Sequence, residues 1–244
     1  MVEQPSVYQY SETFYSIQGE GNYTGIPTAW LRFFLCNLQC DGFMQDDPTD
    51  PSTYDLPYLD IDPENYEKLE DLPVFEKGCD SSYSWSKKFK NLQRSGTAED
   101  IAHTIVDMLK NETNPKGLFK HPTGTHQHMC FTGGEPLMKH GQKAVPEILE
   151  VLKSLEYNTP KSVTFETNGT QPLTSNFIDF FSNRGRWSEE LFWSISPKLE
   201  TVSGEKKSKA IKPDVLKTYR MLSMHGQLKF VMGSEERQWE EMED

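Results

Sequence analysis

The residues best suited to chemistry in this 244-residue chain are its four cysteines, two of which lie close together. Cys36 and Cys40 enclose three residues, directly after an apolar run that is typical of a buried strand. On a short loop at a strand end, both sulfurs can turn toward one metal centre. Two thiolates alone do not hold an iron–sulfur cluster, however, and two buried, unreactive thiols explain the pair equally well.

Strands that could position such a loop alternate with helices along the chain. Apolar runs rich in β-branched and aromatic residues predict strands at 28–34, 128–132, 162–166, 191–196 and 227–232. Helical spacing predicts one helix that begins at Thr97 and further helices at 145–155, 176–181, 214–222 and 234–242. This alternation implies parallel strands joined by crossover helices, in an open sheet or in a full or partial barrel. In either architecture, ligands bind at the carboxyl ends of the strands.

The segment 41–78 interrupts the alternation. It is rich in Asp, Pro, Tyr and Glu and has no clear period. Loops of this length inside a compact domain are uncommon and are usually functional or flexible. Its polar composition predicts little apolar surface for the core, so we expect an insertion loop that projects from the domain and that a two-residue linker could replace.

The composition favours a single domain that acts on a small molecule. A chain of 244 residues with 35% hydrophobic residues can bury one sizeable core, so 1–244 is predicted to form one domain. The formal net charge of −12 argues against direct binding to nucleic acid or to an anionic membrane. Without an apolar run long enough to span a bilayer, and without a secretory signal, we expect a cytoplasmic protein with reduced cysteines.

A family resemblance brings in a third cysteine. The stretch from Phe14 to Cys40, FYSIQGEGNYTGIPTAWLRFFLCNLQC, resembles the N-terminal signature of 7-carboxy-7-deazaguanine synthases, which are radical S-adenosylmethionine enzymes. Their CxxxCxxC motif would place its third cysteine at Phe43, but Cys79-Asp80-Ser81 resembles the missing end of the motif, displaced by the insertion. Closing a long loop costs free energy that grows only logarithmically with its length. The resemblance therefore assigns Cys36, Cys40 and Cys79 to a [4Fe–4S] cluster.

The same resemblance implies a fold and a reaction. The fold would be an incomplete (β/α) barrel with mostly parallel strands. Three cysteine ligands leave one iron open, and in this family S-adenosylmethionine binds there and is cleaved by an electron from the cluster. The family is a group of lyases that convert 6-carboxy-5,6,7,8-tetrahydropterin to 7-carboxy-7-deazaguanine with loss of ammonia, in queuosine-type biosynthesis. The resemblance also implies an electron-donor protein such as a flavodoxin. It leaves open whether the protein forms a homodimer, and it assigns no side chain a catalytic role.

Three strand ends resemble cofactor-binding segments of the family. The residues expected near S-adenosylmethionine are Gly133, Gly134 and Glu135 of GGEP, Thr167 and Asn168 of ETNG, and Ser196 and Lys198 of SPK. Glycines allow close backbone approach, and a carboxylate offers acceptors to an ammonium group. The alternative for each segment is an ordinary turn after a strand. Cys130, within the strand before GGEP, is predicted to be a buried apolar thiol.

Another part of the resemblance concerns the substrate and a second metal. The residues expected to hold the pterin are Gln18, Glu20 and Gly21 of the QGEG loop, together with Arg32. A guanidinium can bind a substrate carboxylate in bidentate fashion, and a carboxylate can accept hydrogen bonds from a guanidine-like pterin edge. A solvated loop and a surface arginine are the alternative. Ser81 stands where the family has a threonine associated with Mg²⁺, and its hydroxyl keeps an oxygen suited to a hard cation.

Two other functions use the same cysteines. A radical-activating enzyme would act on a partner protein and would not need Glu20 and Arg32. A non-catalytic iron–sulfur or zinc-binding module would use the cysteines structurally and would not cleave S-adenosylmethionine.

Overall fold

The computed structural model describes residues 4–156, 158–183, 185, 187 and 189–244. The strands are β1 (Val7–Ile17), β2 (Pro27–Phe33), β3 (Arg94–Thr97), β4 (His128–Gly133), β5 (Ser162–Thr167), β6 (Glu190–Ile195) and β7 (Gly226–Leu228). The α-helices are α1 (Ala98–Leu109), α2 (Lys139–Ser154), α3 (Ser175–Ser182), α4 (Glu200–Ser203), α5 (Lys207–Ala210), α6 (Pro213–Leu222) and α7 (Glu236–Glu243). Within this described part of the chain, no helix is long and apolar enough to cross a membrane.

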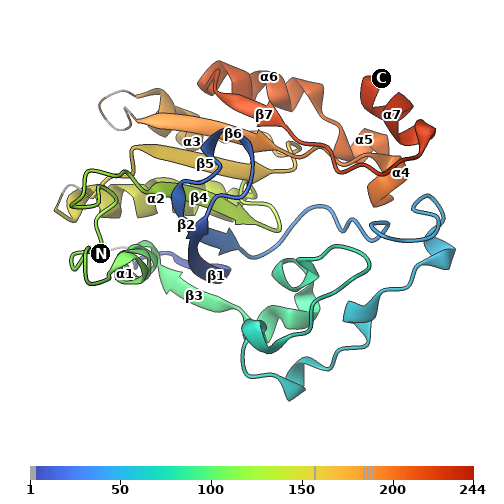
Figure 1. Cartoon of the computed structure of the whole chain (residues 1–244), viewed down its shortest axis with the longest axis horizontal. Coiled ribbons are helices and arrows are strands. Elements are labelled where there is room, and N and C mark those ends of the chain that lie inside the picture. Colours follow the sequence, from blue (N-terminus) through green and yellow to red (C-terminus); the bar gives the residue numbers. More distant parts are fainter. Residues whose placement is uncertain (1–3, 157, 184, 186, 188) are drawn as a thin grey trace.

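The strands form one seven-stranded sheet in the order β3-β1-β2-β4-β5-β6-β7. Strand β1 runs antiparallel to β2 and to β3, whereas β2, β4, β5, β6 and β7 run parallel to one another. The sheet ends at β3 and β7 and does not close on itself (Figure 1). The expected α/β fold, an incomplete barrel with mostly parallel strands, is therefore confirmed.

Alternation along the parallel strands separates the core from a polar face. In β4, Met129 and Phe131 belong to the main hydrophobic core, and the next residue, Thr132, lines a cavity on the other face. Strand β5 repeats this pattern, because Phe165 packs in the core and Glu166 lines the cavity. Successive side chains of a strand point to opposite faces, so each strand supplies both the core and the cavity.

Helices α1, α2, α3 and α6 pack on the core side of the sheet, and α1 shows how the sequence starts them. Thr97 accepts a hydrogen bond from the Asp100 N–H, while the Asp100 carboxylate accepts one from the Thr97 N–H, which forms a capping box. The predicted helix is therefore found in place. Helix α2 begins at Lys139, before the predicted residue 145, and carries Pro146 inside it. The sequence analysis did not predict β1 and β3, and β7 is shorter than predicted.

The insertion 41–78 differs from the expectation of an appendage with little apolar surface. It forms the 3-10 helices η2 (Pro51–Thr53), η3 (Pro57–Leu59), η4 (Pro63–Asn65) and η5 (Leu69–Asp71). Its Tyr58, Leu69 and Phe75 are buried in a second hydrophobic cluster with Trp85 and Phe89. These apolar residues are spaced irregularly, so a search for helical or strand periods does not find them. In Figure 1 the segment runs from blue to teal below the sheet.

Because the insertion has its own core, its truncation should destabilise the fold. Phe75→Ala removes a ring that is 4% exposed and packs against Tyr58 and Phe89, so the free energy of unfolding should fall by about 3 kcal/mol. Val74→Ala is the control, because that neighbouring side chain is 88% exposed. Urea unfolding measures both variants. Equal stabilities would restore the view that the insertion is an appendage.

Candidate cofactor and substrate site

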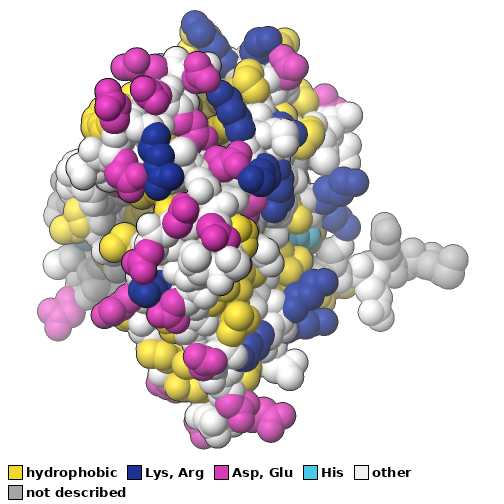
Figure 2. Space-filling model, turned by 90° about the vertical axis from the view of Figure 1, so that its right-hand side faces the viewer, with side chains coloured by type: hydrophobic (Ala, Val, Ile, Leu, Met, Phe, Trp, Pro, Cys, Tyr) yellow, Lys and Arg dark blue, Asp and Glu magenta, His cyan; other side chains and the backbone are white. Residues whose placement is uncertain are grey.

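A cavity of about 640 Å³ opens at the carboxyl ends of the parallel strands. Most of the residues predicted from the sequence line it, namely Glu20, Arg32, Cys36, Cys40, Cys79, Ser81, Gly133, Gly134, Thr167, Asn168, Ser196 and Lys198. Gln18, Gly21 and Glu135 do not belong to its lining. The insertion adds one wall through Leu69, Leu72 and Val74. On the face of the molecule shown in Figure 2, acidic and basic side chains are interspersed.

The loop after β2 brings the cysteines together. Cys36, Cys40 and Cys79 are free thiols; Cys40 is buried in a small cluster with Leu38, and Cys36, Cys79 and Phe43 are partly buried against that cluster. Two non-glycine residues of this segment have left-handed backbones, with φ of 84° at Leu35 and 56° at Cys40. Such conformations cost free energy and persist only where their surroundings enforce them, often at functional sites.

Three thiols match, by their chemistry, the ligands of an iron–sulfur cluster, whose irons are bound by thiolates. Burial raises the pKa of Cys36 to about 12 and raises that of Cys40 well above its usual value, so without a cation both thiols keep their protons. Among the described residues, no group of three or more His, Cys, Asp or Glu side chains could hold one metal ion. In a cubane cluster each thiolate binds a different iron, so the thiolates surround the cluster instead of meeting at one ion. Cys130 is fully buried and lies outside the cavity lining.

Glu135 connects two of the predicted cofactor segments from within the protein. Its carboxylate accepts hydrogen bonds from Leu137 N at 2.9 Å, Thr167 Oγ1 at 2.7 Å and Asn168 N at 2.8 Å. Burial raises its pKa to about 7, although these hydrogen bonds oppose the rise. The side chain is 0% exposed, so it fixes GGEP against ETNG and presents no free oxygen to the cavity.

The two glycines of GGEP let the end of β4 approach the end of β2. A Cβ at Gly133 would lie 2.6 Å from Phe33 O, and a Cβ at Gly134 would lie 2.5 Å from Leu35 O. These contacts are too close for any side chain, so the glycines are required by backbone packing beside the cysteine loop. Their backbones line the cavity as a result.

Arg32 lies in the cavity and is held by partners that the sequence analysis did not identify. Its Nε donates to Glu12 Oε1 at 2.8 Å, and Tyr83 Oη donates to the same oxygen at 3.0 Å. The guanidinium also lies over the rings of Phe14 and Tyr83, at 5.9 and 6.0 Å from their centroids. Glu12 belongs to β1, a strand that was not predicted, so nothing in the local sequence pointed to it.

The QGEG loop is joined to the site by a lysine that was also missed. Lys229 forms ion pairs with Glu20 and, at 3.5 Å, with Glu166, and all three side chains line the cavity. Gln18 is buried and its Oε1 accepts the Glu20 N–H at 3.3 Å. Gly21 has φ of 74°, and a Cβ there would collide with the Gln227 side chain. Gln18 and Gly21 therefore shape the loop that presents Glu20.

Ser196, Lys198 and Ser81 complete the polar lining. Lys198 Nζ donates to Ser196 Oγ at 2.9 Å and lies 5.6 Å from the centre of the Phe43 ring. Ser81 Oγ is 3.6 Å from Cys79 Sγ. The cavity thus places a cation, hydroxyls and amides around the three thiols.

Comparison with known proteins finds relatives of one kind. The chain is 31% identical over 172 residues to the 7-carboxy-7-deazaguanine synthase of Methanocaldococcus jannaschii. The aligned region covers 70% of this chain and 51% of that protein. It is 26% identical over 174 residues to the synthase of Thermoplasma acidophilum, and this aligned region covers 71% of this chain and 51% of that protein. Over about 70% of its length the chain is similar to 7-carboxy-7-deazaguanine synthases.

The match to these synthases is partial. The chain spans about half the length of the curated synthases it matches. No family model matches the chain. The crystal structure of QueE from Escherichia coli aligns with 97% of this chain and 76% of that one, with 21% identity and a TM-score of 0.49.

The position of Glu135 generates a stability prediction. Glu135→Gln replaces one carboxylate oxygen by an NH₂ group that must face a backbone or hydroxyl donor, so the free energy of unfolding should fall by about 2 kcal/mol. Glu166→Gln is the control, since that side chain is partly exposed and should change stability by less than about 1 kcal/mol. Denaturant unfolding of the cluster-free protein measures both. A stable Glu135→Gln variant would leave the carboxylate available for a ligand.

Proposed function

We propose that this chain is a radical S-adenosylmethionine lyase that converts 6-carboxy-5,6,7,8-tetrahydropterin to 7-carboxy-7-deazaguanine and ammonia. The main support for this proposal is that Cys36, Cys40 and Cys79 line one cavity together with Arg32 and Glu20, although the insertion separates Cys40 from Cys79 in sequence. The cavity volume of about 640 Å³ lies within the range of sites for small organic ligands. The synthases that the chain matches carry the name of this activity.

The three thiols would hold a [4Fe–4S] cluster, which when bound supplies the electron that cleaves S-adenosylmethionine. Around them, the chain's own groups can orient the cofactor. Asn168 Nδ2 lies 3.7 Å from Cys36 Sγ, and the Lys198 ammonium is close enough to lower the pKa of both Cys36 and Cys40. A positive group beside the thiolates partly offsets their mutual repulsion.

The substrate end of the cavity would be formed by Arg32 and Glu20. Glu12 occupies Nε of Arg32 and Gly133 O accepts from Nη1 at 3.4 Å, so Nη2 and the remaining N–H of Nη1 are the groups that can bind the pterin carboxylate. Glu20 pairs with Lys229, which keeps its carboxylate at the cavity edge. Asp80 and Ser81, which line the cavity next to Cys79, would supply oxygens for Mg²⁺. The reducing electron would come from a donor protein such as a flavodoxin.

The cysteine assignment predicts iron content. Anaerobically reconstituted protein should contain about four irons per chain, and Cys36→Ala, Cys40→Ala and Cys79→Ala should each abolish the cluster. Cys130→Ala is the matched control, because this thiol is buried outside the cavity. Iron analysis and the visible spectrum report the result. Loss of the cluster in the Cys130 variant, with retention in the Cys79 variant, would overturn the assignment.

The substrate assignment predicts uncoupling. Glu20→Ala and Arg32→Ala should lower pterin turnover by roughly tenfold to a hundredfold, because each removes a charged hydrogen-bonding partner, while cleavage of S-adenosylmethionine persists. Arg220→Ala, an exposed arginine on α6, should change neither activity. Both products are followed in one anaerobic assay. Proportional loss of the two activities would show that these residues serve the cofactor or the fold instead, and cleavage with no pterin product in the unmodified protein would favour a radical-activating enzyme.

A further inference from the structure

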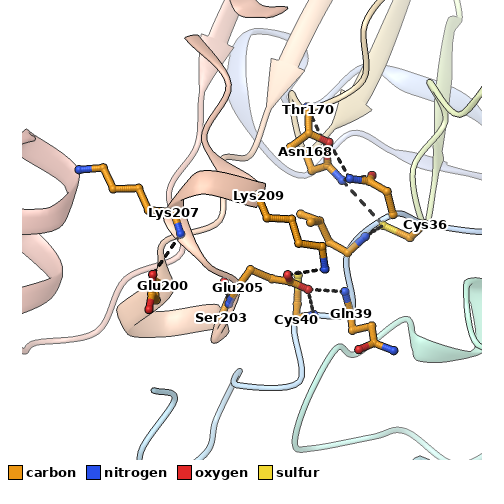
Figure 3. Close-up of polar contacts among 12 residues, drawn as sticks. Cys36, Gln39, Cys40, Asn168, Thr170, Glu200, Ser203, Glu205, Lys207 and Lys209 are labelled. Atoms are coloured by element: carbon orange, nitrogen blue, oxygen red, sulfur yellow. Dashed lines mark hydrogen bonds and ion pairs between the residues drawn. The ribbon is translucent and has the colours of Figure 1, made fainter. Parts of the chain in front are cut away.

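We propose that Glu205 is a positioning residue that holds the cysteine loop in the shape needed to bind the cluster. The inference rests on the proposed cluster site and concerns a residue far from it in sequence. Glu205 follows α4, well after the last of the three cysteines, yet its side chain reaches under the loop that joins Cys36 to Cys40 (Figure 3).

One carboxylate oxygen of Glu205 accepts two consecutive backbone N–H groups. Its Oε1 lies 2.5 Å from Gln39 N and 3.1 Å from Cys40 N. The other oxygen, Oε2, accepts from Lys209 Nζ at 2.8 Å, one helical turn along the chain. The residue is only 7% exposed. A buried carboxylate needs such partners, and here two of them belong to the cysteine loop.

The hydrogen bonds act at the strained point of that loop. Cys40 has φ of 56°, a left-handed conformation that a residue with a Cβ adopts only when its surroundings enforce it. The contact with Cys40 N fixes the peptide that leads into this conformation. Without it, the loop could relax to an ordinary backbone and turn the Cys40 sulfur away from the cavity.

The turn that carries Glu205 is itself locked between the loop and the insertion. Gly42 N donates to Ser203 O at 3.0 Å, and Ser203 Oγ accepts the Glu205 N–H at 3.2 Å. Gly204 has φ of 72°, and a Cβ there would collide with Tyr54 of the insertion. The carboxylate therefore connects the cysteine loop to a rigid turn, and this turn also contacts the start of the long segment between Cys40 and Cys79.

The test compares three variants of the full-length chain. Glu205→Met fills similar space without an acceptor, and Glu205→Gln keeps an oxygen for Gln39 N and Cys40 N while losing the charge. Glu200→Met is the matched control, because Glu200 accepts the Lys207 N–H at 3.0 Å on the same segment and does not contact the loop (Figure 3). Backbone amide exchange is measured in the cluster-free protein. Iron release to a chelator and the electron paramagnetic resonance spectrum are measured after reconstitution.

We expect Gln39 and Cys40 amides to be protected in the unmodified protein, in Glu205→Gln and in Glu200→Met. In Glu205→Met both amides should exchange roughly tenfold to a hundredfold faster, and iron should be released faster by a similar factor with an altered spectrum. The thermal midpoint of each variant separates this local effect from general unfolding.

Several results would overturn the inference. These are unprotected Gln39 and Cys40 amides in the unmodified protein, unchanged iron release in Glu205→Met, or iron loss from Glu205→Gln as fast as from Glu205→Met. If Glu205→Met does not fold, the unmodified protein and Glu205→Gln still decide. If the unmodified protein binds no iron, the proposed function is wrong. Amide exchange still tests the contact between Glu205 and the cysteine loop in that case.

Discussion

Three thiols meet at one cavity, with Cys40 buried and Cys36 and Cys79 partly buried, and the surrounding structure has to hold them there although a long insertion separates the second thiol from the third. Burial raises the pKa values of Cys36 and Cys40, so these two thiols are stable as neutral groups or as thiolates that a cation neutralises. The loop that carries the first two thiols therefore needs support from outside itself. That support comes from β4, from the turn after α4 and from the insertion.

Because successive side chains of a strand point to opposite faces, the two faces of the sheet carry different sets of residues. The side that faces the helices is filled by aromatic and aliphatic side chains, and the opposite side carries Thr132, Glu166 and Ser194 at the carboxyl ends of β4, β5 and β6. A change in the cavity can then occur without a change in the main core, which is how one fold can support different chemistries. The insertion extends this separation, because its apolar residues form their own cluster beside the site.

Buried carboxylates serve as supports in two places. Glu135 joins the GGEP and ETNG segments, and Glu205 joins the cysteine loop to the turn after α4. Both accept at least one buried backbone N–H, from Asn168 to Glu135 and from Cys40 to Glu205, and leaving a buried donor without an acceptor is costly. A carboxylate can satisfy two donors from a distant segment at once, so it fixes irregular loops that no helix or sheet ladder would hold.

Local sequence patterns were enough to predict the alternation of strands and helices, the mostly parallel sheet and the residues at the carboxyl ends of its strands. These follow from local periods and from motifs such as GGEP and ETNG, which are contiguous in the chain. The roles predicted for individual site residues remain predictions. Only the tertiary structure decided that the insertion has a core, that Glu12 holds Arg32 and that Lys229 joins Glu20 to Glu166. It also decided that Glu135 faces the protein and that Glu205 supports Cys40. Each of these contacts joins segments far apart in the chain, and their partners are chosen by packing in three dimensions, which leaves no period or spacing in the sequence to reveal them.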